Sequence, residues 1–260
     1  MSKIAYTLAC LVLLVACVSL PEVSGQGMRM LRRPISSGPT PTPTPTPTPA
    51  PCTYTGEGTL AFWYKMNAES YANNDPIGTF TDQSGNGINA TASGSNRPTY
   101  KTSQINSLAA ADFDGVDDYL LNSISTYNQP NVVFIVAKEL TGTDQVMMDG
   151  NSGRHFVGVA GGIFYLYTTS LLNCGAQSPN TWRVYEAVFD GASSELLYNG
   201  VSQATGNTGV DPLSLNAVIG AGISGTYPFK GQIAELLFYD SITSPNRATI
   251  RACLQAKYGL

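Results

Sequence analysis

The chain has little charge, a single histidine, few cysteines and no long apolar run after residue 20. Charged residues make up only 12% of its 260 residues. The histidine is His155, and no serine in a nucleophile-elbow context accompanies it in the sequence. We therefore expect no Ser-His catalytic site, and we interpret His155 as an exposed loop residue.

Basic residues are also scarce. Residues 54–260 contain ten Lys or Arg against seventeen Asp or Glu, a net charge of −7. Nucleic acids and anionic membranes attract clustered cations, so this composition argues against both as partners. No apolar stretch after residue 20 is long enough to cross a bilayer.

Three cysteines lie beyond the first 25 residues: Cys52, Cys174 and Cys253. They show no C-x-x-C spacing and therefore give no zinc signature. Cys52 and Cys253 stand near the two ends of the domain, and domain termini are often close in space. A Cys52–Cys253 disulfide is one expectation, and it would leave Cys174 as a buried thiol.

The first 25 residues resemble a secretory signal peptide. A short basic start precedes the uncharged apolar run 4–20, and small residues at 23–25 favour cleavage before Gln26. Two alternatives remain open. The run is near the lower length limit for a membrane helix, and Leu14-Val15-Ala16-Cys17 resembles a lipobox, in which Cys17 becomes the lipidated first residue. We expect the mature protein to be secreted or held at the cell surface, with a lipid anchor as its only membrane contact.

A linker rich in proline and threonine follows at residues 26–51, and its end reads PTPTPTPTPTPAP. Proline at every second position removes backbone donors, so this segment is excluded from helices and sheets. We expect an extended polyproline-II spacer of roughly 40 Å, at about 3.1 Å per residue. Its threonines suit O-glycosylation, although an inert linker is the simpler interpretation.

Residues 54–260 have the pattern of one all-β domain. Short β-prone segments alternate with Gly, Asn and Asp clusters, and Asn199-Gly200 predicts a two-residue hairpin. In the segment 184–189, Tyr185, Ala187 and Phe189 form the more apolar face, as in a strand covered on one side. We expect strands at residues 60–66, 107–113, 119–121, 132–140, 146–149, 156–160, 163–169, 181–190, 195–198, 201–205, 215–220 and 231–239.

One helix is expected, at the C-terminus. Ser244 is its predicted N-cap, Pro245 its first residue and Gly259 its end. Ile250 and Leu254 recur at helical spacing, so we expect them to be buried against one sheet.

Six short sequence segments occur in the following order: LAFWYK, DQSGNGINATA, RPTYK, DFDGVDDYL, GQIAELLFYD and the closing KYGL. Together they resemble the laminin G-like group of concanavalin A-like jelly-roll domains, over about residues 58–260. The resemblance implies a two-sheet jelly-roll β-sandwich with a short C-terminal helix. It also implies a secreted or cell-surface protein, because the group includes carbohydrate-binding modules, adhesion domains and some glycosidases.

Calcium is the cofactor that such a resemblance implies. Asp82, Ser84, Asn86 and Gly87 match the start of a calcium loop, but Ser93 stands where a self-sufficient loop needs a bidentate Glu. The same residues also form a good turn. A metal site at Asp82 and Asn86 would therefore need the carboxylates of Asp114 and Asp117. Those aspartates belong to the crowded phrase DFDGVDDYL, and they are equally suited to shape a hairpin turn.

Sugar binding needs flat aromatic faces together with groups that match hydroxyls. Tyr165 and Tyr167 share one strand face, and Asn151 and Arg154 lie in a polar loop. These four residues are the candidate ligand site, whereas Trp63 and Trp182 lie mid-strand and are expected in the core. No catalytic residue is assigned, because the glucanase spacing Glu-x-Asp-x-x-Glu is absent and no expected strand carries a carboxylate pair.

We expect a non-catalytic carbohydrate-binding or surface-recognition module on a Pro-Thr stalk, with a glycan or cell-surface partner. One alternative is a structural or adhesion module that binds a protein and has no sugar site. A third interpretation is an atypical glycoside hydrolase.

Overall fold

The structure, a computed structural model, describes residues 52, 54, 56–142 and 144–260. The expected signal peptide, the lipobox at Cys17 and the linker at residues 26–51 lie outside the described residues. Within the described part of the chain, no helix has both the length and the apolar character that a bilayer span requires.

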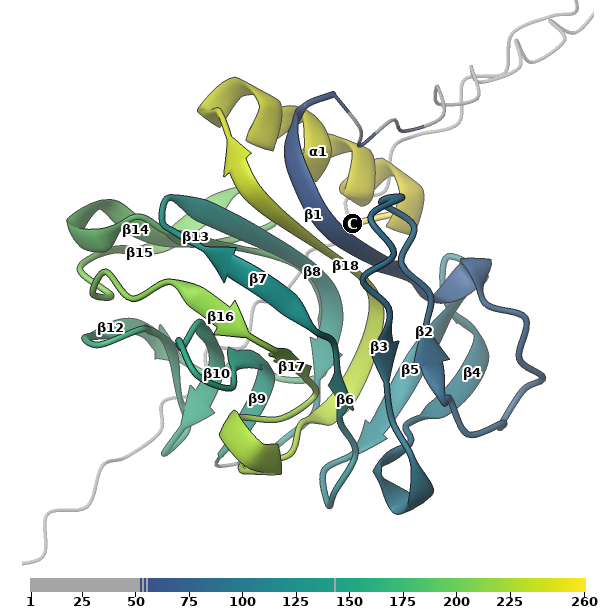
Figure 1. Cartoon of the computed structure of the whole chain (residues 1–260). Helices are drawn as coiled ribbons and strands as arrows, with labels where there is room; N and C mark the ends of the chain where they lie inside the picture. The colour runs from purple at the N-terminus through teal and green to yellow at the C-terminus, as the bar shows by residue number, and fades with distance from the viewer. Residues whose placement is uncertain (1–51, 53, 55, 143) are drawn as a thin grey trace, which may run out of the picture. The chain divides into compact units, whose positions relative to one another are not determined.

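The domain is a sandwich of two large antiparallel sheets, each of eight strands (Figure 1). Sheet A runs in the order β15-β14-β13-β8-β18-β5-β4, and β1 pairs with β18 beside this path. Its strands are β1 (Gly58–Lys65), β4 (Thr99–Ile105), β5 (Leu108–Asp114), β8 (Asn131–Glu139), β13 (Trp182–Phe189), β14 (Ser194–Tyr198), β15 (Val201–Gly206) and β18 (Lys230–Ile242).

Sheet B runs in the order β12-β11-β10-β9-β17-β6-β3-β2. Its strands are β2 (Thr79–Phe80), β3 (Ala90–Thr91), β6 (Leu120–Leu121), β9 (Gln145–Gly150), β10 (Phe156–Ala160), β11 (Ile163–Tyr167), β12 (Leu171–Ala176) and β17 (Ala217–Ile219). A small third sheet pairs β7 (Ile124–Tyr127) with β16 (Leu213–Leu215). Four short 3-10 turns occur at Met66–Ala68, Gly94–Asn96, Gly191–Ser193 and Ile223–Gly225.

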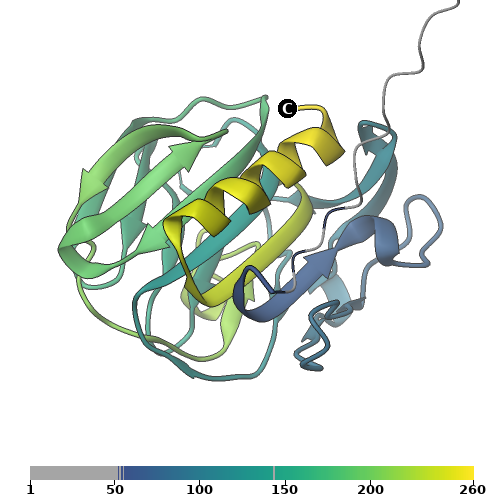
Figure 2. The same ribbon diagram turned by 90° about the horizontal axis from the view of Figure 1, so that it is seen from above.

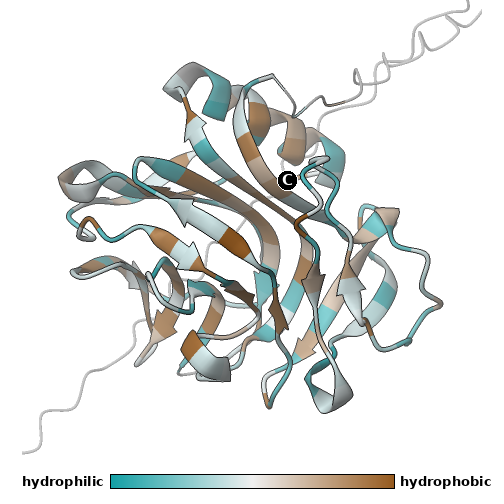
Figure 3. Ribbon diagram, viewed as in Figure 1, coloured by the Kyte–Doolittle hydropathy of each residue, from teal (hydrophilic) through white to brown (hydrophobic). Residues whose placement is uncertain are grey.

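Strand β18 organises sheet A. This strand of 13 residues pairs with β8 on one side from Gly231 to Tyr239, while its start pairs with β5 and its later part with β1 on the other. The main core lies between the two sheets, where the rings of Phe62 and Phe238 stack with centroids 4.9 Å apart. Hydrophobic residues accordingly run along the strands, and hydrophilic ones gather in the connecting loops (Figure 3).

The outer face of sheet A is covered by α1 (Ser244–Tyr258), which lies across its strands (Figure 2). Ile250 and Leu254 are fully buried there, as expected from their spacing. The helix ends at Gly259, whose φ of 69° is a left-handed cap conformation. The N-cap, however, is Thr243 rather than the predicted Ser244, which makes Pro245 the second helical residue.

Cys52 and Cys253 form a disulfide, with their Cα atoms 5.6 Å apart, and this is the pairing that the sequence favoured. Cys174 remains a free, buried thiol. The disulfide fastens the start of the domain to α1, on the covered side of sheet A.

The predicted strands agree with the observed ones over most of the domain, and the hairpin at Asn199-Gly200 joins β14 to β15 as expected. The predicted strand 215–220 is wrong at its start. Leu215 has a left-handed φ of 70° and ends β16, so that the following strand begins only at Ala217. Strands β2, β3, β4, β7, β12 and β16 were not predicted, because they are short or rich in small and polar residues.

Candidate functional site

Two of the candidate sugar-binding residues stand on the outer face of sheet B. Phe164 and Leu166 of β11 point into the core with no exposed surface, so the alternate residues Tyr165 and Tyr167 face outward. Gly161 and Gly162, both at positive φ, form the two-residue turn that joins β10 to β11. This tight turn fixes the register of the hairpin.

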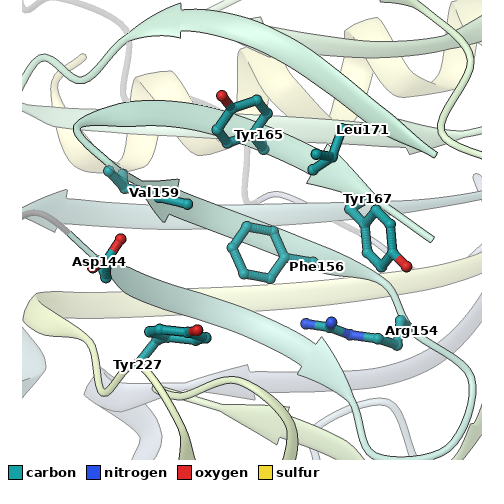
Figure 4. Close-up of a pocket in the computed structure, with 9 residues that line it drawn as sticks. Asp144, Arg154, Phe156, Val159, Tyr165, Tyr167, Leu171 and Tyr227 are labelled. Carbon is teal, nitrogen blue, oxygen red and sulfur yellow. The ribbon is translucent and has the colours of Figure 1, made fainter. Parts of the chain in front are cut away.

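These tyrosines border a hollow of about 340 Å³, within the size range of small-molecule sites. Its lining is mostly apolar and aromatic and comes from β10, β11, β12 and three loops (Figure 4). The residues that line it are Asp144, Arg154, Phe156, Val159, Ala160, Tyr165, Tyr167, Leu171 and Tyr227. We call this hollow the aromatic pocket.

The floor of the aromatic pocket depends on a glycine. Phe156 pairs with Tyr167 across the hairpin, and Gly158 pairs with Tyr165. A Cβ atom on Gly158 would lie 3.2 Å from the tip of the Phe156 ring and 2.5 Å from the backbone oxygen of Gln145. Since Gly158 has no side chain, the Phe156 ring extends over its backbone and occupies the centre of the pocket (Figure 4).

Arg154 is held at one end of the pocket by a buried carboxylate. Its Nε and Nη2 atoms donate to Asp149, whose side chain is fully buried on β9. The guanidinium also lies 5.1 Å from the centroid of the Tyr167 ring and 5.6 Å from that of Phe156. Burial raises the pKa of Asp149, although Arg154 and the Gly150 amide oppose this effect by stabilising the anion.

Tyr227 borders the pocket from a loop between β17 and β18 and is 52% exposed. Its φ of 52° lies in the left-handed region, which is strained for a residue with a side chain. The Val146 amide, which donates to the Tyr227 carbonyl at 3.0 Å, helps to hold the loop in place. Strain of this kind is often retained where a side chain has a function.

The structure therefore brings three of the four candidate ligand residues together: Arg154, Tyr165 and Tyr167. Asn151 is not among the lining residues, because its side-chain oxygen accepts from the Ser224 amide at 3.2 Å instead. Phe156, Leu171 and Tyr227 were missed. The turn Gly161-Gly162 could have placed Phe156 opposite Tyr167, whereas nothing in the sequence links Tyr227 to this hairpin.

His155 is not an exposed loop residue, contrary to the expectation. Its side chain is fully buried, its Nε2 atom lies 2.9 Å from the Asn131 side-chain oxygen, and its ring lies 4.3 Å from that of Phe189. Burial lowers the pKa of His155 to about 3. His155 is consequently a neutral core residue, and its side chain does not line the aromatic pocket.

In the candidate calcium loop, the side chains of Asp82 and Asn86 make hydrogen bonds within the protein. The two carboxylate oxygens of Asp82 accept from the backbone amides of Trp63, Ser84 and Ile88 and from the Ser84 hydroxyl, at 2.8–3.0 Å. The side-chain amide of Asn86 donates to two carbonyls of β1. These contacts leave Asp82 little capacity to bind a cation.

Three neighbouring aspartates, Asp114, Asp117 and Asp118, have carboxylate oxygens within 4.8 Å of one another. This is the one such group of His, Cys, Asp or Glu found in the described part of the chain, and Asp82 is not a member. Asp118 accepts from the Asp114 amide at 2.9 Å, and Asp114 accepts from the Val116 amide at 2.7 Å. Burial, with a smaller contribution from the neighbouring aspartates, raises the pKa of Asp118 to about 6.

The remaining candidates lie on the covered side of sheet A. Trp63 and Trp182 are half-buried against the cluster beneath α1. Trp63 donates to Glu235, which also binds Lys257 at 2.7 Å. Glu186 is held by two arginines of α1, Arg247 and Arg251. These acidic groups fasten the helix to the sheet.

No protein-family model and no curated protein sequence matches this chain. Solved structures share its fold. Domain 4 of the extracellular arabinanase AbnA from Geobacillus stearothermophilus, in complex with arabinotriose, matches with a TM-score of 0.55 and 16% identity, over 75% of this chain and 99% of that one. Trypanosoma rangeli sialidase, in complex with sialic acid, matches with a TM-score of 0.53 and 11% identity, over 76% of this chain.

The binding domain of botulinum neurotoxin DC, in complex with SialylT, matches with a TM-score of 0.52 and 11% identity, over 77% of this chain. The matches span 33% of the sialidase and 52% of the toxin domain. At these identities the likeness establishes the fold. The described part of the chain is a sandwich of two large antiparallel sheets with one C-terminal helix.

Proposed function

We propose that this domain is a non-catalytic, exported carbohydrate-binding module and that the aromatic pocket on sheet B binds the glycan. The observation that carries the proposal is the arrangement of Phe156, Tyr165, Tyr167 and Tyr227 around one solvent-open hollow. Aromatic faces pack against the C–H faces of sugar rings, and polar groups at the edge bind hydroxyls. The sugars in the structures of similar fold support the same choice.

The proposal of export is supported by the disulfide. Disulfide bonds persist mainly in oxidising compartments, outside the cytoplasm. The Cys52–Cys253 bond lies where the Pro-Thr linker would enter the domain, so the module would be carried at the end of its stalk. A lipid anchor at Cys17 remains part of this proposal as the means of attachment to a cell surface.

The number of carboxylates at the aromatic pocket supports the proposal that the domain is not catalytic. Glycosidases commonly need two carboxyl groups about 5–10 Å apart, on either side of the sugar. Among the lining residues the only carboxylate is that of Asp144, while Asp149 lies buried behind Arg154. A protein partner is the second candidate, and the 65% exposure of Leu171 at the pocket favours it.

A glycan array probed with the exported domain, in calcium and in chelator, tests this function. We expect binding to at least one glycan in both conditions, and we expect Tyr165→Ala and Tyr227→Ala each to weaken it about tenfold or more. Tyr119→Ala is the matched control, since this tyrosine lies outside the aromatic pocket. Incubation of the bound glycan with the protein should release no product.

Binding to no glycan in either condition would contradict the carbohydrate proposal and favour a protein partner. Equal losses in all three tyrosine variants would place the sugar site elsewhere.

A further inference from the structure

The charges at the aromatic pocket determine which glycans it accepts, and this inference rests on the proposed function. Three charged side chains are relevant: Arg154 and Asp144, which line the pocket, and Asp149, which lies behind Arg154. No other lining residue is charged. The formal charge of the set is therefore −1, despite the arginine.

Arg154 is poorly suited to bind a carboxylate of the ligand. Two nitrogens of its guanidinium already donate to Asp149, which is fully buried and cannot leave to make room. Asp149 uses one bidentate edge of the guanidinium and balances its positive charge, so a ligand carboxylate would find only the second edge of an already neutralised pair. Within the described part of the chain, Nη1 of Arg154 donates to no other residue, so it is free to donate to a sugar hydroxyl.

Asp144 lies at the other end of the pocket, with the Phe156 ring between it and Arg154 (Figure 4). Its Oδ1 atom accepts from the Gly161 amide at 2.8 Å, which fixes the carboxylate beside the β10–β11 turn. Its second oxygen is available to accept from a sugar hydroxyl. A negative group fixed at this end repels an anionic ligand, and the net charge of −7 on residues 54–260 adds to that repulsion.

We infer that the aromatic pocket selects neutral glycans over acidic ones and that Asp144 is a specificity-determining residue. A neutral sugar places its apolar face on Phe156 and the tyrosines and exchanges hydroxyl hydrogen bonds with Arg154 and Asp144. A uronic or sialic acid gains the same stacking, but its carboxylate meets an arginine whose charge is already balanced by Asp149 and must approach the fixed anion Asp144. The binding free energies of neutral and acidic glycans therefore differ mainly by this electrostatic repulsion.

Matched sugar pairs test the inference by calorimetry at low ionic strength, pH 7. The pairs are lactose and 3′-sialyllactose, galactotetraose and tetragalacturonic acid, and xylotetraose and its glucuronic acid-substituted form, with arabinotriose as a further neutral probe. For each pair that binds, we expect the neutral member to bind at least about fivefold more tightly, as one exposed charge interaction of up to about 1 kcal/mol allows. High salt should narrow the difference.

Asp144→Asn keeps the oxygen that accepts from Gly161 and removes the charge. We expect the Asp144→Asn variant to reduce the ratio of neutral-glycan to acidic-glycan affinity a few-fold at low salt. Asp240→Asn removes the same charge from β18 on sheet A, outside the lining residues, and should leave this ratio as it is in the unaltered protein.

The outcomes separate the two proposals. Equal or tighter binding of the acidic members, or a ratio that Asp144→Asn does not change, overturns the inference while leaving carbohydrate binding intact. Binding of none of these sugars, together with an empty glycan array, overturns the proposed function and the inference with it.

Discussion

Glu139 shows how one residue can make the stability of this domain depend on pH. Its side chain lies at the end of β8 with no exposed surface, and its oxygens make no hydrogen bond of normal geometry to a described residue. Burial therefore raises the pKa of Glu139, and the nearby Ser178 amide and Arg183 guanidinium offset this only in part.

We expect Glu139→Gln to stabilise the domain at neutral pH. A carboxyl whose pKa is raised by folding stabilises the native state below the pKa of the unfolded chain, about 4.3, and this contribution is lost as the pH rises through the folded-state pKa. The variant should match the parent near pH 4 and exceed its free energy of unfolding by about 1–3 kcal/mol at pH 8. Urea unfolding across this range measures the difference.

Glu57→Gln is the control, because it makes the same substitution at a partly exposed residue. A difference between Glu139→Gln and the parent that stays constant from pH 4 to pH 8 would contradict the prediction.

The two faces of strand β11 have different roles at the aromatic pocket. In β11, alternate residues fill the core or face the pocket, so Phe164 and Leu166 secure the strand that presents Tyr165 and Tyr167. Gly158 on the neighbouring strand makes room for the Phe156 ring. The aromatic pocket is therefore built on paired strands, which favours a preformed hollow.

At the scale of elements, α1 is fastened to sheet A by three kinds of contact. Ile250 and Leu254 supply apolar burial, Glu186 and Glu235 accept from basic residues of the helix, and Cys253 is bonded to Cys52. The disulfide closes a loop of 201 residues, and a bond across so long a segment restricts the unfolded chain strongly.

We expect reduction of this disulfide to lower the free energy of unfolding by about 2–5 kcal/mol. Denaturant unfolding with and without reductant measures the change, and thiol titration should show two additional free thiols. Cys52→Ser should behave like the reduced protein and no longer respond to reductant. Cys174→Ala is the control, since Cys174 lies outside the bond and the variant should still respond.

An unchanged unfolding midpoint after both thiols have appeared would show that the bond contributes no stability.

At the scale of the molecule, the sandwich is asymmetric. The outer face of sheet A is closed by α1 and the segment that contains Cys52 and Tyr54, whereas the outer face of sheet B carries the aromatic pocket. If the domain is attached through the segment at Cys52, the point of attachment lies on the outer side of sheet A. The outer face of sheet B then remains accessible to a partner.

We expect calcium to leave the melting temperature of the whole domain unchanged. An ion that binds only the folded state must raise that temperature, yet Asp82 is committed to its turn and Asp114 and Asp118 accept from backbone amides. Thermal melts in millimolar calcium and in chelator make the comparison. A rise in calcium that Asp117→Asn abolishes would instead support the metal site expected from the sequence.

The sequence by itself determined the all-β class, most strand positions and the terminal helix, whereas the Cys52–Cys253 pairing was one expectation that the structure confirms. Strand alternation, turn residues and helix-end residues act over a few neighbouring positions, so they can be read directly from the chain. The same local pattern placed Tyr165 and Tyr167 on one face of β11. It could not say whether that face was the core or the surface.

Only the tertiary structure decided that question, because burial depends on which sheet covers which. It also buried His155, which lies in a polar sequence segment but is enclosed by Phe189 and Asn131 from distant strands. The pocket joins Phe156 with Tyr227, some seventy positions later, and the turn at Asp82 closes on Trp63 of β1. Such contacts arise from the pairing of sheets and loops far apart in the chain, which no short segment encodes.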